Sequence, residues 1–266
     1  MLAADERAFG DLGVDVEWID FPGGTGAIMA ALESGTIDVA TPLTEGAVTA
    51  IVNGNPSRLA RIFVASPLLW GVHVAADFPA ESLEDLEGNR FAISRFGSGS
   101  ELMSRVLAED RGWLLDDASW VEVGDVDGAL EALSGGDAEI FLWNKSMTQP
   151  HVDRGVLRRV DVVRTPWPSF AVAVSEPTRR FTPGLAEAIA DVAAARAAGV
   201  VFDPGSPALI AERFGLNADD AVAFLDQIEW AEAGQPIDTT MIESVMTRMH
   251  ALGRIDTLVD PRSLLT

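Results

Sequence analysis

Residues 16–45 constrain the fold more than any other stretch, because strand, turn and helix patterns follow one another closely there. They read VEWIDFPGGTGAIMAALESGTIDVATPLTE. Branched and aromatic residues predict a strand over 14–19, which a proline and a cluster of glycines end. A helix is predicted over 27–33, and Gly35 is placed to cap its C-terminus. Residues 37–40 are predicted to form a short buried strand.

Polar side chains follow both of these predicted strands. Thr25 lies before the helix, and Thr44 and Glu45 follow the second strand. In open α/β sheets, ligands bind at the edge formed by the carboxyl ends of the strands. The stretch therefore predicts recognition of a small molecule on a parallel sheet. Glu45 is placed either to accept hydrogen bonds from a ligand amine or ring N–H, or to act as a helix N-terminal acid.

The same order of elements returns between residues 90 and 146: a strand, a serine and glycine loop, a helix, a short strand and a polar tip. Two α/β units of like construction predict two lobes. Strands are predicted over 59–65, 67–76, 90–94, 121–123, 139–143, 160–164 and 170–174. Further helices are predicted over 2–10, 45–53, 101–111, 126–134, 183–198, 206–214, 218–228 and 236–252.

Composition excludes several classes of function. The formal net charge is −22, with 41 acidic residues against 19 basic ones, which disfavours nucleic acid and anionic membrane surfaces as partners. Cysteine is absent, so disulfides, thiol nucleophiles and cysteine metal sites are excluded. His73, His151 and His250 lie far apart, without the spacing of metal ligands, and are expected to be isolated polar contacts. No metal or cofactor is predicted, since neither a dinucleotide fingerprint nor a P-loop is found.

The loop Phe96–Ser100, at the start of a predicted helix, is the strongest chemical signal. Its sequence is FGSGS. Glycines expose backbone N–H groups, serines add hydroxyls, and a helix N-terminus favours negative charge. Arg95 adds a cation directly before the loop. The pattern predicts contact with a ligand, and the alternative is a serine N-cap in a tight turn.

Several tryptophans and the single lysine each have two interpretations. Trp143 ends a predicted strand and Trp167 lies between two prolines, so each either stacks on a flat ligand or packs in the core or hinge. The other tryptophans are predicted to serve core or lobe packing: Trp18, Trp70, Trp113, Trp120 and Trp230. Lys145 either forms a Schiff base, which implies an enzyme, or is a solvated charge or ion-pair partner.

Three segments resemble a known superfamily. GVDVEWIDFPGGTGAIMAALESGTIDVA resembles the opening of type II periplasmic binding proteins of the sulfonate, nitrate and taurine group. That superfamily also contains the thiamine-pyrimidine synthases. SLEDLEGNRFAISRFGSGSELM is similar to the start of the second lobe, and IFLWNKSMTQPHVDRGVLRRVDVVRTPWPSF resembles one branch that has fungal members. The resemblance covers nearly the whole chain.

The resemblance implies an α/β fold of two lobes, with the ligand bound in a cleft between them and closure by a hinge motion. Lobe 1 is expected to comprise residues 1–77 and 168–266, and lobe 2 residues 78–167. The chain is expected to cross near 77–79 and 165–168. Carried over residue by residue, the ligand-binding positions are Thr25, Gly26, Thr44, Glu45, Ser94, Arg95, Ser98, Ser100, Trp143, Asn144 and Trp167.

Two departures from the family pattern bear on function. Family members begin with a strand before the helix expected at 2–10, and that strand and a signal peptide are expected to be missing here. The thiamine-pyrimidine synthases resembled carry a cysteine-rich motif, which this chain lacks. An extracytoplasmic location is expected if a signal peptide was lost upstream, and a cytoplasmic one if Met1 is the start.

The resemblance implies a monomeric solute-binding protein that captures a small organic solute, anionic or aromatic, without a cofactor. Its expected partner is the permease of an ABC importer. The alternatives are a thiamine-pyrimidine-synthase-like enzyme that uses Lys145 and a cytoplasmic ligand sensor.

Overall fold

The computed structural model describes residues 8–21 and 23–266, which form two compact units. Unit 1 comprises the described residues up to Pro67, then Trp167–Ser206 and Leu225–Thr266. Unit 2 comprises Leu68–Pro166 and Pro207–Phe224. These bounds differ from the predicted lobes, because residues 68–77 and 207–224 belong to unit 2 and Trp167 belongs to unit 1.

Unit 1 is built on a three-stranded sheet. Its order is β1 (Val39–Ala40), β8 (Phe170–Val174), β2 (Arg58–Val64), and β8 runs antiparallel to both neighbours. The parallel sheet predicted for this part of the chain is therefore wrong within the described residues. The reason is topological: the two early strands do not pair with each other, because a much later strand lies between them.

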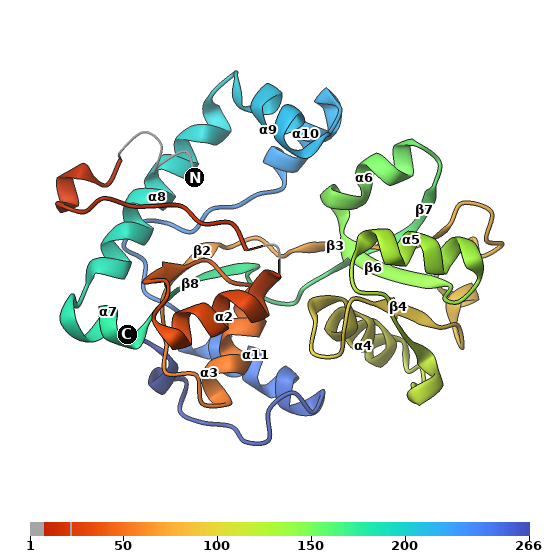
Figure 1. Ribbon diagram of the computed structural model, residues 1–266, viewed down its shortest axis with the longest axis horizontal. Coiled ribbons are helices and arrows are strands. Elements are labelled where there is room, and N and C mark those ends of the chain that lie inside the picture. The colour runs from red at the N-terminus through yellow and green to blue at the C-terminus, as the bar shows by residue number, and fades with distance from the viewer. Residues whose placement is uncertain (1–7, 22) are drawn as a thin grey trace. The chain divides into compact units, whose positions relative to one another are not determined.

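Helices cover both faces of the unit 1 sheet (Figure 1). On one side α3 (Thr44–Val52) packs with α2 (Gly24–Ser34) and α11 (Thr239–Ala251), and on the other side lies α8 (Leu185–Phe202). Side chains of β8 alternate in the way a strand requires. Val172 and Val174 join the cluster beneath α8, while Ala171 and Ala173 are equally buried but lie outside that cluster. The unit also contains α7 (Glu176–Phe181).

Unit 2 contains a mixed five-stranded sheet. Its strand order is β5 (Trp120–Glu122), β4 (Phe91–Ile93), β6 (Ile140–Asn144), β3 (Leu69–Ala75) and β7 (Leu157–Arg164). β4 is parallel to β5 and β6, whereas β3 is antiparallel to β6 and β7. Three helices flank the sheet (Figure 1): α4 (Gly99–Arg111), α5 (Val126–Gly135) and α6 (Lys145–Asp153). Two further helices are α9 (Ser206–Phe214) and α10 (Ala218–Asp226).

Helix ends follow the sequence signals closely. Gly35 ends α2 with φ 69°, a left-handed conformation that glycine adopts without steric cost, and its N–H bonds the carbonyls of Ala31 and Leu32. Ser98 begins α4 by accepting a hydrogen bond from the N–H of Glu101. The predicted helices at 27–33 and 101–111 are therefore confirmed, with ends shifted by a few residues.

The predicted strand at 14–19 is wrong. These residues pair with no strand in the described part of the chain, and the side chains of Trp18 and Ile19 are 48% and 49% exposed. Of the two packing roles predicted for Trp18, packing in the core is wrong, since the side chain is exposed and its indole donates to Asp20 Oδ1 at 2.8 Å. The helix predicted at 2–10 falls mostly outside the described residues.

Candidate functional site

The N-terminus of α3 brings together three of the predicted site residues. Thr44 and Glu45 form its first turn, and Thr25 reaches it from the first turn of α2. The Thr25 hydroxyl accepts a hydrogen bond from the N–H of Leu43 at 3.0 Å. Gly46 permits this approach, because a Cβ there would lie 2.5 Å from Thr25 Cγ2.

Glu45 is held by Trp167 from a distant part of the chain. The Trp167 indole N–H donates to Glu45 Oε2 at 2.7 Å, and both side chains are buried, at 4% and 1% exposure. The next residues of that segment also contact α3, since the N–H of Thr44 donates to the carbonyl of Ser169 at 3.1 Å. Trp167 therefore positions a carboxylate in this structure.

Two buried polar atoms at this helix end have no hydrogen-bond partner among the described residues. They are Thr44 Oγ1 and Glu45 Oε1, on side chains that are 0% and 1% exposed. Leaving a buried polar group unpaired costs about 1–3 kcal/mol, and more for a charged group. Such unpaired groups call for a specific explanation, and a bound ligand supplies one.

Burial raises the pKa of the Glu45 carboxyl from 4.5 to about 7. The raising effect is desolvation, which disfavours the charged form. The backbone N–H of Glu45 and the indole of Trp167 oppose it, because hydrogen bonds to a carboxylate favour the ionised form. Near neutral pH this carboxyl therefore exchanges readily between its charged and neutral states.

Gly26 does not join the Thr44 and Glu45 pair through any hydrogen bond found in the described residues. It lies in the first turn of α2 and is exposed. A role for Gly26 in ligand binding stays a prediction.

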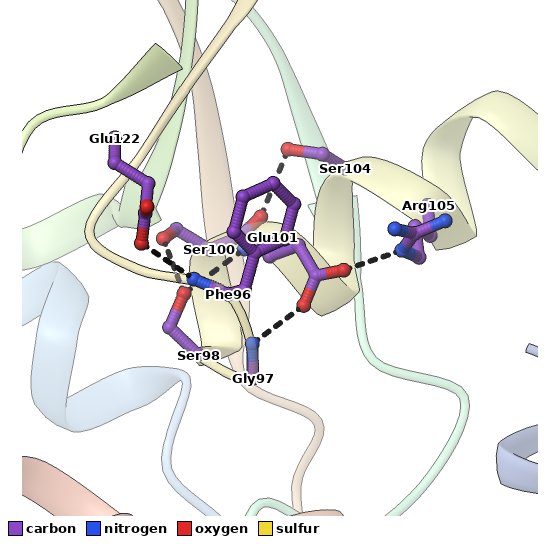
Figure 2. A network of polar contacts seen from close by, with 8 residues as sticks. All are labelled: Phe96, Gly97, Ser98, Ser100, Glu101, Ser104, Arg105 and Glu122. Carbon is purple, nitrogen blue, oxygen red and sulfur yellow. Dashed lines mark hydrogen bonds and ion pairs between the residues drawn. The ribbon is translucent and has the colours of Figure 1, made fainter. Parts of the chain in front are cut away.

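The hydroxyls of Ser94, Ser98 and Ser100 lie together in unit 2; Figure 2 draws Ser98 and Ser100. Ser100 Oγ accepts from the N–H of Ser94 at 2.9 Å and lies 3.0 Å from Ser98 Oγ and 3.3 Å from Ser94 Oγ. Ser98 Oγ also accepts from the N–H of Glu101 at 3.3 Å. All three serines are buried. The N-cap interpretation of Ser98 is thus confirmed, whereas ligand contact by these serines stays a prediction.

Carboxylates already bind the loop's exposed backbone donors (Figure 2). The N–H of Phe96 donates to Glu122 Oε1 at 3.1 Å, and the N–H of Gly97 donates to Glu101 Oε2 at 2.8 Å. The other oxygen of Glu101 pairs with Arg105 Nε at 2.5 Å. These two acids did not figure in our sequence prediction. The spacing of Ser98 and Glu101 is a capping-box pattern that signals one of them.

Arg95 is exposed, and no hydrogen bond or ion pair of its side chain is found in the described part of the chain. The described residues of unit 2 therefore supply no partner for the Arg95 guanidinium, which was predicted to be the cation of an anion site. Contact between Arg95 and a ligand stays a prediction.

Trp143 and Asn144 have structural roles in unit 2. The Trp143 ring stacks on Phe141 with centroids 5.4 Å apart and packs against the core beneath α5, which supports its core interpretation. Asn144 caps α6, since its Oδ1 accepts from the N–H groups of Ser146 and Met147. Ligand contact by Trp143 or Asn144 stays a prediction.

A second polar network surrounds His73, which was expected to be an isolated polar contact. His73 is fully buried; its Nδ1 lies 3.2 Å from the carbonyl of Phe141, and its Nε2 lies 2.9 Å from Thr148 Oγ1. Arg159 Nε donates to the same Nε2 at 3.3 Å. Because a carbonyl can only accept, the proton belongs on Nδ1. Burial, with the nearby charge of Arg159, lowers the pKa of His73 to about 3.

No metal site is evident in residues 8–21 and 23–266, where no group of three or more His, Asp or Glu side chains is placed to hold an ion. No helix in the same residues is long and apolar enough to span a membrane.

Comparison with known proteins identifies the fold. A family model described as Ca3427-like PBP matches residues 70–163. No match is found among curated proteins. The product of the Candida albicans CA3427 gene, described as having the generic periplasmic binding protein structural fold, is 22% identical, with a TM-score of 0.88 over 100% of this chain and 91% of that chain.

Two sulfonate-binding proteins have similar structures. The periplasmic aliphatic sulphonate binding protein SsuA from Escherichia coli is 17% identical, with a TM-score of 0.79 over 100% of this chain and 87% of that chain. The alkanesulfonate-binding protein SsuA from Xanthomonas axonopodis pv. citri, bound to MOPS, is 18% identical, with a TM-score of 0.82 over 100% and 93% of the two chains. The chain therefore has the α/β fold of periplasmic binding proteins, as the sequence resemblance implied.

Proposed function

We propose that this protein is a solute-binding protein that captures a small organic solute at the N-terminus of α3. The observation that carries the proposal is the pair of buried, unpartnered atoms Thr44 Oγ1 and Glu45 Oε1. The fold supports it, since similar structures are described as sulfonate-binding proteins. Thr25 and Trp167 complete the site by fixing the helix end and the carboxylate.

Binding at this site needs no covalent chemistry. A solute that bonds Glu45 Oε1 and Thr44 Oγ1 replaces two missing hydrogen bonds, so the protein recovers the cost of leaving those atoms buried and unpaired. Trp167 already holds the other carboxylate oxygen, which reduces the ordering required when the solute binds. Preorganised acceptors of this kind favour reversible capture, and we propose no catalysis.

The proposed partner of the loaded protein is the permease of an ABC importer. A receptor that passes its solute to a permease must release it, so reversible hydrogen bonding suits that role. Genes for a permease and an ATPase beside this gene, with solute uptake that depends on all three, are the expected observation.

A screen with matched variants tests the binding site. A solute library is screened by thermal shift, because a ligand that binds only the folded state raises the melting temperature in proportion to RT ln(1 + [L]/Kd). A hit is then measured with Glu45→Gln and Thr44→Val. The controls are Glu33→Gln, on the exposed surface of α2, and Thr49→Val, further along α3.

We expect at least one solute whose affinity falls about tenfold or more, equivalent to about 1.4 kcal/mol, in both site variants and stays unchanged in both controls. A hit that binds all five proteins equally would place the site elsewhere. A library without any hit would count against solute binding itself.

A further inference from the structure

We infer that the solute presents a cationic, hydrogen-bond-donating nitrogen to Glu45, and not an anionic group. The inference rests on the proposed function and names the class of solute that the same site selects. It departs from the sulfonates named for the structural neighbours. The contacts at the N-terminus of α3 support it.

The support is the set of side-chain contacts at the N-terminus of α3. The Trp167 indole binds Glu45 Oε2, the N–H of Leu43 binds Thr25, and the N–H of Thr44 binds the carbonyl of Ser169. The side-chain atoms that stay buried and unpartnered there are a carboxyl oxygen and a hydroxyl. An ionised carboxylate can only accept hydrogen bonds, so it requires a donor from the solute.

When Glu45 is ionised, an anion at this position would meet a buried carboxylate with no compensating cation. No ion pair to Glu45 is found in the described residues. Two like charges in a buried site repel each other strongly, because the effective dielectric there is far below that of water. The same environment strengthens the attraction between Glu45 and a cation.

The charge of the whole chain agrees with this selectivity. With a net charge of −22, the protein attracts cations and repels anions at long range. The electrostatic field of the net charge alone does not determine where a solute binds. Together with the unpaired acceptors at α3, it favours the approach and the binding of the same class of solute.

Two series of probes with one ring and opposite head groups test the inference. Benzylamine and benzamidine carry cationic donors, whereas benzenesulfonate and benzylphosphonate carry anions. Each is titrated by calorimetry into the full chain and into Glu45→Gln, Thr44→Val and Glu33→Gln. Circular dichroism confirms that each variant is folded, and Thr44→Val keeps the test decisive if Glu45→Gln does not fold.

We expect the cationic series to bind, with affinity reduced at least tenfold by Glu45→Gln, reduced less by Thr44→Val and unchanged by Glu33→Gln. Anions that bind the wild type and lose affinity in Thr44→Val would overturn the inference while leaving the proposed site intact. Cations that bind Glu45→Gln as well as the wild type would overturn it too. So would the absence of binding in both series, in which case the library screen decides separately whether the protein binds any solute.

Discussion

Trp167 donates its indole N–H to Glu45 at 2.7 Å, and in doing so joins the segment that leads into β8 to the first turn of α3. The contact uses one carboxyl oxygen and leaves the other without a partner in the described residues. It is a bond between a fixed aromatic donor and a buried acid, across 122 positions of sequence. Under the proposed function, stability and binding are therefore coupled at this one pair.

Trp167→Phe should destabilise the protein by about 1–3 kcal/mol, because it leaves the buried Glu45 without its side-chain donor. The matched control is Trp143→Phe, which removes an indole N–H that has no partner in the described residues. That control should cost less, since no hydrogen bond is lost. Denaturant titration of both variants at pH 7 measures the difference, and equal losses would show that ring packing, not the hydrogen bond, is what Trp167 contributes.

Glu45 should make the protein less stable as the pH rises from about 4.5 to 7. Its pKa is raised on folding, so the folded state holds the proton more tightly than the unfolded state does. The contribution is fully present below pH 4.5 and is lost as the pH rises through about 7, by about 3 kcal/mol at 1.36 kcal/mol per pH unit.

The measurement compares the free energy of unfolding of the wild type and of Glu45→Gln across this pH range. Glutamine does not titrate, so the difference between the two proteins should change steadily from pH 4.5 to 7 and then level off. A constant difference would mean that the pKa of Glu45 is the same in the folded and unfolded states.

Most helices and strands of this protein were predictable because glycines and capping residues mark where each hydrophobic pattern begins or ends. Gly35 ends α2 where the sequence placed the cap, and Ser98 begins α4. The strand at 14–19 could not be judged in the same way. Its alternating pattern is real, but a strand also needs a hydrogen-bonded neighbour, and the pairing of β8 between β1 and β2 is not encoded in any local pattern.

The candidate site was predictable in its residue types and not in its contacts. Thr25, Thr44 and Glu45 were predicted from their places beside strands and turns, and they do meet at one helix end. Whether Trp167 would stack on a ligand or hold Glu45 depends on tertiary packing. The contact of Glu122 with the loop also depends on tertiary packing, because Glu122 lies in β5 whereas the loop follows β4.

His73 should have the opposite effect to Glu45 on acid stability. Its pKa is lowered on folding to about 3, so below pH 6.5 the histidine is protonated in the unfolded state and stays neutral in the folded state. The contribution of His73 to the free energy of unfolding is therefore fully present above pH 6.5, and it falls by about 2 kcal/mol as the pH drops to about 5.

The variant His73→Gln tests this pH dependence. It should flatten the slope of the free energy of unfolding between pH 6.5 and 5, although it lowers stability at neutral pH by disturbing the network with Thr148 and Arg159.

Gly71 should tolerate no side chain, because the ring of His73 occupies the space where a Cβ would lie. A Cβ at position 71 would fall 2.3 Å from His73 Cε1 and 2.9 Å from Arg159 Nε. Since both ring nitrogens of His73 make hydrogen bonds, the ring cannot move aside without breaking the network. Gly71→Ala should therefore destabilise the protein by about 1–3 kcal/mol, the usual cost of overpacking.

The matched control is Gly135→Ala. Gly135 lies at the end of α5, where a Cβ would meet its nearest neighbour at 3.7 Å, so alanine there should be neutral or slightly stabilising. Thermal unfolding of the two variants gives the comparison, and a Gly71→Ala protein as stable as the wild type would show that the His73 ring has room to shift.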